Sequence, residues 1–255
     1  MEPRGAGAGA SRARGERASG DQAQSGDRLL GGRPPGDPDF DVPAPDPPTP
    51  YRLAQRQGQE AMRRTLLDAA SRLLLEEGPG ALTMRRVAGA VGCSTTVLYT
   101  MFGGKEGLAD ALYREGFERL RRRLEAVDGD PGPQARLGAL AHAYRDSALA
   151  ERGYYGVMFQ QAIPKFRPSP GSLAVAGASL EVLTQAVGAA MAAGALRSGD
   201  PRAVAEVLWA AVHGAVSLEL AGHFPDPEVA DDRFQTLASA AILPFLPEPP
   251  TQRRR

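Results

Sequence analysis

An apolar stripe between residues 62 and 74 is the first strong pattern along the chain. Apolar side chains recur there at the three- and four-residue spacing of one helix face, with Arg and Asp side chains off that face. The stripe consists of Met62, Leu66, Ala69, Ala70, Leu73 and Leu74. A Gly-Pro-Gly run at 78–80 cannot continue a helix. The pattern therefore predicts a first helix that begins near Gln55 and ends before Gly78.

Two short helices joined by a tight turn are predicted next. Thr83 offers a hydroxyl to cap a helix over residues 84–91, and Gly92 stops that helix. Ser94 is placed to cap a second helix over residues 95–102. The residues of this second helix that can anchor it inward are Val97, Leu98 and Met101 or Phe102. Two such helices around a Gly-containing turn form a helix-turn-helix.

Helical spacing continues through the rest of the chain, and alternating strand patterns are absent. Further helices are predicted over 105–126, 134–150, 152–162, 172–193, 201–221 and 230–245. The stripe of the first of these that faces the core consists of Leu108, Ala111, Leu112, Phe117, Leu120 and Leu124. The predicted fold class is all-α, with a three-helix helix-turn-helix domain followed by a larger helical domain.

Composition divides the chain into four parts. The boundaries predicted are a tail at 1–54, a helix-turn-helix domain at 55–107, a helical domain at 108–247 and a basic tail at 248–255. Residues 1–50 hold nine Gly and nine Pro, a share typical of disordered segments. Three interpretations of this tail stay open: an arm that lies along DNA, an inert extension, or a start codon chosen too far upstream. The basic residues of such an arm would be Arg4, Arg12, Arg14 and Arg17.

Charge is zero over the whole chain, but it is unevenly distributed. Residues 51–105 carry eight basic and four acidic side chains, so the positive excess coincides with the helix-turn-helix. The single cysteine, Cys93, excludes a disulfide within the chain and a multi-cysteine zinc site, and packing is its expected role. We expect no membrane-spanning run and no secretory signal, and a cytoplasmic location.

The segment from Leu82 to Leu108 resembles the DNA-binding domain of the TetR family of bacterial regulators. It combines an "LT–R–VA––VG" helix, an "S–––LY––F" helix and a "GKE–L" entry into the next helix, and the resemblance covers about residues 58–115. Further along, Trp209, His213 and Gly214 resemble the W-x3-HG motif of one subgroup of the family. The resemblance implies a homodimer that reads a near-palindromic DNA operator, with a ligand in the helical domain that alters the separation of the two DNA-binding heads.

The second short helix is the expected recognition helix. Short polar side chains at Thr95, Thr96 and Thr100 can contact base edges, and the Tyr99 hydroxyl can donate to a phosphate. Further predicted DNA contacts are Thr83, Arg85, Ser94 and Lys105. Two positions depart from the family pattern, because Val97 stands where Thr is common and Gly104 where Ser or Asn usually caps the next helix. These departures leave the operator sequence open.

Aromatic residues concentrate around residue 155, which favours a ligand pocket for an apolar effector. The candidate pocket residues are His142, Tyr144, Tyr154, Tyr155, Met158, Phe159 and Phe166, with an ordinary core as the alternative. Trp209, His213 and Gly214 are expected at a dimer interface or at the pocket edge. No group of residues has the spacing of a metal site, so neither a metal nor a cofactor is expected.

Three hypotheses of function follow from these patterns. The favoured one is a repressor that a small, largely apolar molecule releases from a palindromic operator. A ligand-independent or activating regulator is the first alternative, because the fold does not fix the sign of regulation. An enzyme that uses the helical domain is disfavoured, because the sequence lacks a nucleophile–base pair and a phosphate-binding Gly loop.

Overall fold

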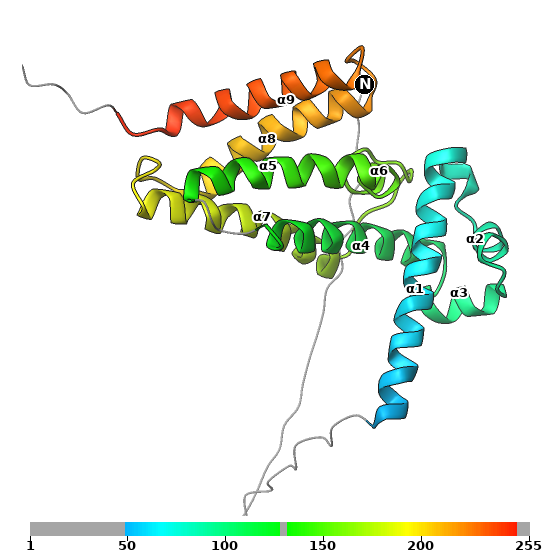
Figure 1. The fold of residues 1–255 in the computed structure, drawn as a ribbon. Helices are drawn as coiled ribbons and strands as arrows, with labels where there is room; N and C mark the ends of the chain where they lie inside the picture. The colour runs from blue at the N-terminus through cyan, green and yellow to red at the C-terminus, as the bar shows by residue number, and fades with distance from the viewer. Residues whose placement is uncertain (1–48, 128–131, 249–255) are drawn as a thin grey trace, which may run out of the picture. The chain divides into compact units, whose positions relative to one another are not determined.

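In a computed structural model, the described residues, 49–127 and 132–248, form helices and turns and no strand, as predicted (Figure 1). In chain order the elements are α1 (Pro50–Glu77), the 3-10 turn η1 (Pro79–Ala81), α2 (Met84–Val91), α3 (Thr95–Phe102), α4 (Lys105–Glu125), α5 (Pro133–Ala150), α6 (Arg152–Phe159), α7 (Pro170–Ala192), α8 (Pro201–Leu220), α9 (Pro227–Ile242) and the 3-10 turn η2 (Leu243–Phe245). The predictions for residues 1–48 and 249–255 lie outside the described residues.

Helix α1 begins at Pro50, five residues before the predicted start. The Thr49 hydroxyl accepts the Arg52 backbone N–H at 3.4 Å, and Pro50 occupies a first-turn position where a missing N–H is not needed. The apolar stripe could not reveal this start, because residues 50–61 are exposed and lack one, and Met62, predicted as its first member, is itself 38% exposed. Residues 50–54, assigned to the tail from the sequence, are therefore helical.

The helix-turn-helix has the predicted bounds. The Thr83 hydroxyl caps α2 by accepting the Arg86 N–H at 3.2 Å, and Gly92 closes α2 in the left-handed conformation at φ 76°. Ser94 stands at the N-cap position of α3, but its side chain makes no capping hydrogen bond, contrary to expectation. The fully buried residues that join α1 to α4 include Leu66, Leu67, Leu82, Val87, Leu98, Leu108 and Leu112. Leu98 and Phe102 anchor α3, whereas Val97 and Met101 are only half-buried.

Helices α4 to α9 form the larger helical domain. Helix α4 packs against α5, α6 and α7, and α8 lies between α7 and α9 (Figure 1). The predicted stripe of α4 is buried throughout. Most helix ends fall within two residues of the prediction. Helix α6 ends three residues early, because Gln161 adopts a positive φ of 52° and Pro164 follows. Helix α9 starts three residues early, because the Asp226 carboxylate caps it by accepting the Val229 N–H.

Helices α7 and α8 are long and apolar enough to cross a membrane, judged by length and composition alone. Each holds an 18-residue window of mean hydropathy 1.4, so the expectation that no run approaches this length was wrong. Core helices of proteins without a membrane part pass the same test, and both helices pack on others here.

Asp110 on α4 is hydrogen-bonded to the start of α7. Its Oδ1 accepts the Ser169 backbone N–H at 2.8 Å, and its Oδ2 accepts the hydroxyls of Ser169 at 3.0 Å and Ser172 at 2.8 Å. Burial acts to raise the pKa of Asp110, but these hydrogen bonds outweigh it and hold that pKa below its usual value. The carboxylate therefore stabilises the fold in its ionised form.

We expect Asp110→Asn to lower the free energy of unfolding by about 1 kcal/mol at neutral pH, because a hydrogen bond to a charged acceptor is stronger than one to an amide. The folded-state pKa of Asp110 is depressed, so the advantage of the wild type is complete above the unfolded pKa. It is lost as pH falls through the lower folded pKa. Thermal unfolding of both proteins from neutral to acidic pH checks this, and a constant difference across that range would contradict it.

Candidate nucleic-acid interface and ligand cavity

The outward face of α3 is polar. Thr95, Thr96, Tyr99 and Thr100 are exposed, and the Tyr99 side chain is 55% exposed despite its size. The Thr100 hydroxyl donates to the Thr96 carbonyl at 2.9 Å, which fixes its rotamer and leaves its methyl group and oxygen lone pairs accessible. A short helix anchored by two buried residues thus presents four polar side chains to a partner.

The other residues predicted to contact DNA surround this face. Arg85 and Lys105 are exposed at the starts of α2 and α4, and neither makes an ion pair within the part of the chain that the structure describes. The Thr83 amide donates to the Ala81 carbonyl at 2.8 Å, so this N–H is not available to a phosphate, and a DNA contact by Thr83 would have to use its hydroxyl. Arg86 pairs with Glu77 and helps to hold α2 against α1.

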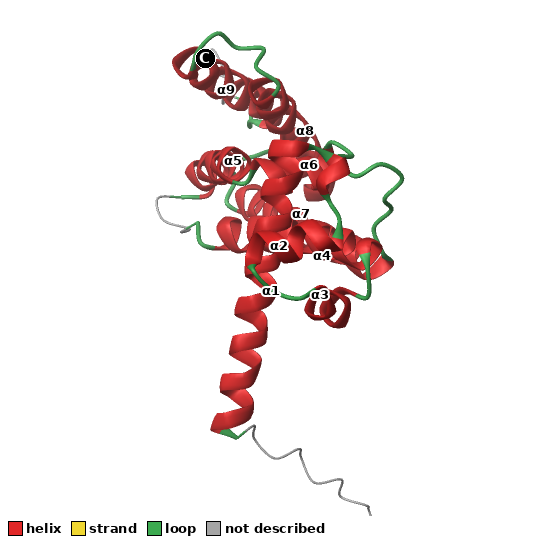
Figure 2. Cartoon of the chain, turned by 90° about the vertical axis from the view of Figure 1, so that its right-hand side faces the viewer, coloured by secondary structure: helices red, strands yellow, loops and turns green. Residues whose placement is uncertain are grey.

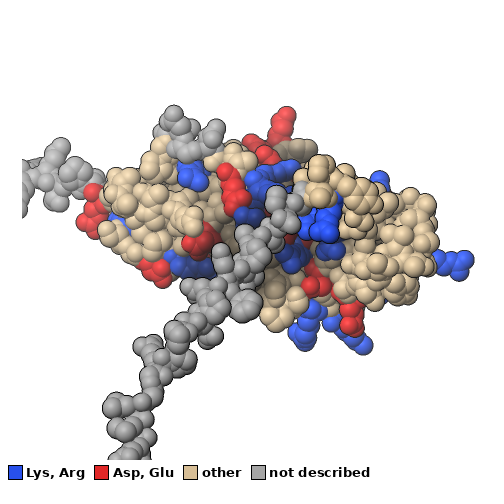
Figure 3. All heavy atoms as spheres, turned by 90° about the horizontal axis from the view of Figure 1, so that it is seen from below, with Lys and Arg blue, Asp and Glu red and all other residues tan. Residues whose placement is uncertain are grey.

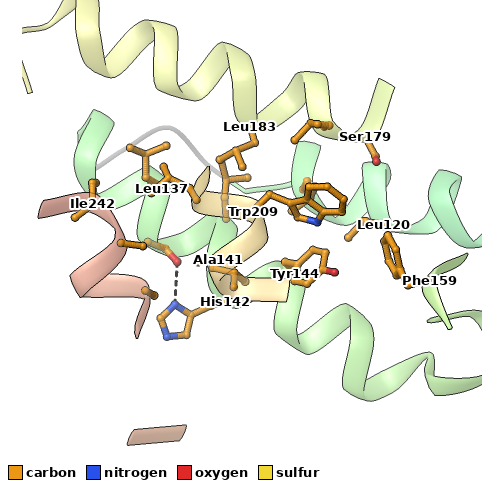
Figure 4. Close-up of a pocket in the computed structure, with 18 of the residues that line it drawn as sticks. Leu120, Leu137, Ala141, His142, Tyr144, Phe159, Ser179, Leu183, Trp209 and Ile242 are labelled. Atoms are coloured by element: carbon orange, nitrogen blue, oxygen red, sulfur yellow. Dashed lines mark hydrogen bonds between the residues drawn. The ribbon is translucent and has the colours of Figure 1, made fainter. Parts of the chain in front are cut away.

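A cavity of about 530 Å³ lies within the helical domain (Figure 4). Its walls come from α4 to α9, and among the described residues that line it none is Asp, Glu, Lys or Arg. Large lining residues include Tyr113, Phe117, Leu120, Leu137, Phe159, Leu183 and Trp209. The polar lining residues are Gln134, His142, Tyr144, Ser179, Gln235 and Ser239. A volume in this range and a mostly apolar wall are typical of small-molecule sites.

His142 is a polar residue of the cavity wall with both ring nitrogens hydrogen-bonded. Its Nδ1 lies 2.9 Å from the Gly138 carbonyl oxygen, so this nitrogen carries the proton (Figure 4). Its Nε2 then accepts a hydrogen bond from the Gln235 amide at 2.6 Å. The pair joins α5 to α9 at the edge of the cavity.

The predicted pocket residues divide into two groups. His142, Tyr144, Met158, Phe159 and Trp209 line the cavity. Those that do not line it are Tyr154, Tyr155, Phe166, His213 and Gly214. The sequence analysis missed the whole wall from α7 and α9, where many lining residues are small and give no sign that space rather than packing lies beside them.

Tyr155 and His213 lie behind the cavity in a buried polar cluster. The hydroxyls of Tyr144 and Tyr155 lie 2.7 Å and 3.1 Å from His213 Nδ1, and the Tyr155 hydroxyl lies 2.9 Å from Ser217 Oγ. Burial lowers the pKa of His213, so its ring is neutral and Nδ1 can accept a hydrogen bond from a tyrosine hydroxyl. Tyr144 belongs to both the cluster and the cavity, and Phe159 packs edge-on against His213.

A second polar cluster joins α1 to α4 and α6. The Arg119 guanidinium donates to Asp68 at 2.6 Å, Glu115 at 2.8 Å and Glu151 at 3.2 Å, and lies 4.5 Å above the Tyr154 ring. The Tyr154 hydroxyl donates to Asp68 at 2.9 Å, and burial raises the pKa of this phenol so that it stays protonated. We call Asp68, Glu115, Arg119, Glu151 and Tyr154 the α1–α6 joint.

Two glycines allow the close approach of helices at the α1–α6 joint. A Cβ at Gly153 would lie 2.4 Å from the Ser71 carbonyl oxygen of α1, and a Cβ at Gly116 would lie 2.6 Å from the Met158 sulfur. Helix α6 is thus pressed against both α1 and α4. Because Met158 and Phe159 line the cavity, the same eight-residue helix contacts the cavity at one end and α1 at the other.

The chain combines a helix-turn-helix, whose second helix has a polar face, with a helical domain that contains an apolar cavity. These two features define the class of DNA-binding transcriptional regulators that respond to ligands. The family model described as "Bacterial regulatory proteins, tetR family" matches residues 66–112. That described as "Tetracyclin repressor-like, C-terminal domain" matches residues 137–241. The chain belongs to the tetR family of bacterial regulatory proteins.

Individual relatives agree with this assignment. An HTH-type transcriptional regulator of Mycobacterium bovis is 23% identical over 223 residues, which cover 74% of this chain and 95% of the relative. Among solved structures, a protein of unknown function from Rhodococcus sp. RHA1 has a TM-score of 0.63 and 29% identity, covering 72% of this chain and 95% of that one. The TetR family transcriptional regulator PfmR from Thermus thermophilus has a TM-score of 0.55 and 19% identity, covering 72% and 99%, and supports the fold alone.

Proposed function

We propose that this regulator is a repressor that binds a palindromic operator as a homodimer and is released by a neutral, largely apolar small molecule. The observation that carries the proposal is the dual contact of α6, which lines the cavity with Met158 and Phe159 and holds α1 through Tyr154. A constitutive regulator would have no need for such a cavity. The description of the C-terminal family model as repressor-like favours repression over activation.

The chemistry of the cavity defines the class of effector. A charged ligand would have to be buried without a counter-ion from the described residues, because none of those that line the cavity is charged, and that burial is costly. The polar positions at His142, Tyr144 and Ser179 can hydrogen-bond one or two polar groups of a ligand. An uncharged molecule with an aromatic or aliphatic body therefore fits best.

Release of the DNA is proposed to pass through α6. A ligand that displaces Met158 or Phe159 pushes α6 along its axis or away from α4. Because α6 packs closely on α4 at Gly116 and on α1 at Gly153, it cannot shift without moving these helices. The α1–α6 joint then carries the displacement to α1, which packs on α2, and α2 in turn packs on α3. The two heads of a dimer would no longer match successive turns of the major groove.

A homodimer through α8 and α9 is proposed from their exposed apolar side chains. Val207 and Leu218 on α8 are 50% and 47% exposed in the single chain, and Leu237 on α9 and Leu243 after it are also exposed. Large apolar side chains gathered on two adjacent helices favour burial against a second copy. Trp209, His213 and Gly214 support the proposal that the C-terminal domain belongs to the W-x3-HG subgroup. A regulator of bacterial genes would act in the cytoplasm.

Selection of duplexes from a random-sequence library by the purified protein tests the proposal. We expect one inverted repeat to be enriched and bound in a gel-shift assay. Tyr99→Ala should weaken binding to all sequences, because it removes a phosphate contact, whereas Thr96→Ala should change base preference by about 1–3 kcal/mol at one position. Ala90→Ser, exposed on α2, is a control that should leave both unchanged. Full binding by both α3 variants would contradict the assignment of the recognition helix.

A further inference from the structure

The N-terminal half of α1 projects beyond the helix-turn-helix that it belongs to. In Figures 1 and 2 this part of the helix continues past α3 without a neighbouring helix. We call residues 50–64 the α1 extension, and all of them except the half-buried Arg63 are exposed. At 1.5 Å per residue the α1 extension is about 22 Å long. An exposed helix of this length gains no stability from packing on the apolar core, so a binding partner would explain why it is retained.

One face of the α1 extension forms a groove with the recognition helix. Arg56, Gln59, Glu60 and Arg63, at helical spacing, line this groove together with residues of α3. The α3 residues are Ser94, Thr96, Val97, Thr100 and Met101. Farther along α1, the same face carries Leu66, Leu67 and Ala70 of the buried core. The face therefore changes from apolar to basic and polar where it leaves the protein interior, which is unfavourable for packing on protein.

The charge of the α1 extension suits an anionic partner. It carries Arg52, Arg56, Arg63 and Arg64 against one acidic residue, Glu60. Within residues 49–127 and 132–248, none of these four arginines makes an ion pair. Figure 3 shows the molecule from below, where basic side chains outnumber acidic ones on the part that carries α1 to α3. The Arg63 guanidinium lies 5.0 Å above the Phe102 ring, which holds it beside the end of α3.

We propose that the α1 extension is a second DNA-contacting element, in which Arg52 and Arg56 bind phosphates of the strand that runs beside α3. The inference rests on the proposed function, because it requires α3 to enter the major groove. The major groove of DNA is about 12 Å wide, so the phosphates of one strand must lie close to the inserted helix. In the protein, the α1 wall of the groove between α3 and the α1 extension carries Arg56 and Arg63. Guanidinium groups match phosphate oxygens in geometry and charge.

The test compares salt dependence in the full chain, with the duplex recovered by the selection described above as the probe. The double variant Arg52→Gln/Arg56→Gln removes both charges and retains helix-forming residues. We expect its plot of log affinity against log salt to be less steep by about 0.9 per lost phosphate contact, with affinity lower by on the order of five-fold per contact near physiological salt. The preferred sequence should not change, because phosphate contacts carry no base readout.

Two further variants separate charge at this place from other effects. Arg52→Lys/Arg56→Lys keeps the charge and should recover most of the salt dependence, which a folding defect would not allow. Arg197→Gln removes an exposed charge just before α8, far from the helix-turn-helix in Figure 1, and should behave as wild type. Circular dichroism should show equal helix content in all proteins.

The inference is overturned if the wild type binds its duplex and the Gln variant has the same salt dependence and affinity. It is also overturned if the Gln variant changes only the oligomeric state in sedimentation, because the α1 extension would then contact protein. These results leave the proposed function intact. Failure of the wild type to select any duplex would instead remove the proposed function, and the inference with it.

Discussion

Arg119→Met should bind operator DNA and lose most of its response to the effector. Arg119 is the shared partner of Asp68, Glu115 and Glu151 and stacks on Tyr154, so its loss removes the ion pairs of the α1–α6 joint and leaves the Tyr154–Asp68 hydrogen bond between α1 and α6. Coupling between two sites is typically about 5- to 150-fold in affinity, and we expect the variant to reduce that factor to near one. Titration of the protein–DNA complex with a neutral apolar compound identified by thermal shift measures this factor.

The same variant should be less stable, which gives a readout that needs no effector. The Arg119 side chain is 20% exposed and that of Glu115 is 11% exposed, so removing the cation leaves carboxylates partly buried without it. We expect a loss of about 3 kcal/mol in the free energy of unfolding, the low end for a broken buried ion pair. Arg121→Met is the matched control, because its exposed pair with Glu125 should contribute under about 0.5 kcal/mol. Equal effects of the two variants would contradict the role of the α1–α6 joint.

Ala141→Phe should abolish most effector binding without weakening DNA binding. Ala141 lies on α5 and lines the cavity, so a benzyl side chain there occupies the space of a ligand (Figure 4). An overpacking cost of about 1–3 kcal/mol corresponds to roughly a 5- to 150-fold loss of ligand affinity. Isothermal titration of the effector into the free protein and gel-shift of the operator measure the two properties separately.

Ala139→Phe is the control for this change. Ala139 lies on the same helix two residues earlier, is exposed, and does not line the cavity. Its effector affinity should equal that of the wild type. If Ala141→Phe binds the effector as tightly as Ala139→Phe does, the cavity is not the effector site, although the DNA-binding part of the proposal would be unaffected.

Local signals explain why the helix-turn-helix could be predicted from the sequence. Thr83 and Gly92 mark the two ends of α2, and the buried positions Leu98 and Phe102 of α3 determine that its threonines face outward. The start of α1 could not be predicted from periodicity, because the α1 extension has no buried face. Pro50 and Thr49 were the available signal, and the Pro-rich segment before them concealed it.

The cavity was only partly predictable, because the direction of a side chain depends on contacts between distant helices. Tyr154 and Tyr155 belong to the aromatic cluster that suggested a pocket. Consecutive residues of a helix point about 100° apart, and these two face Asp68 and His213 instead. Met158 and Phe159, one turn later, do face the cavity. Aromatic content located the correct helix, whereas the choice among its residues required the packing of α6 between α1, α4 and α8.

The described residues of the cavity wall are uncharged, and this has a consequence for the physiology of the cell. An uncharged, mostly apolar molecule partitions into the hydrocarbon interior of a lipid bilayer and crosses it without a carrier. The concentration that reaches the cavity then follows the concentration outside the cell, with no import step to control the delay. A bacterium with this regulator would read its chemical surroundings directly, and genes for export or breakdown of such compounds would be suitable targets for its control.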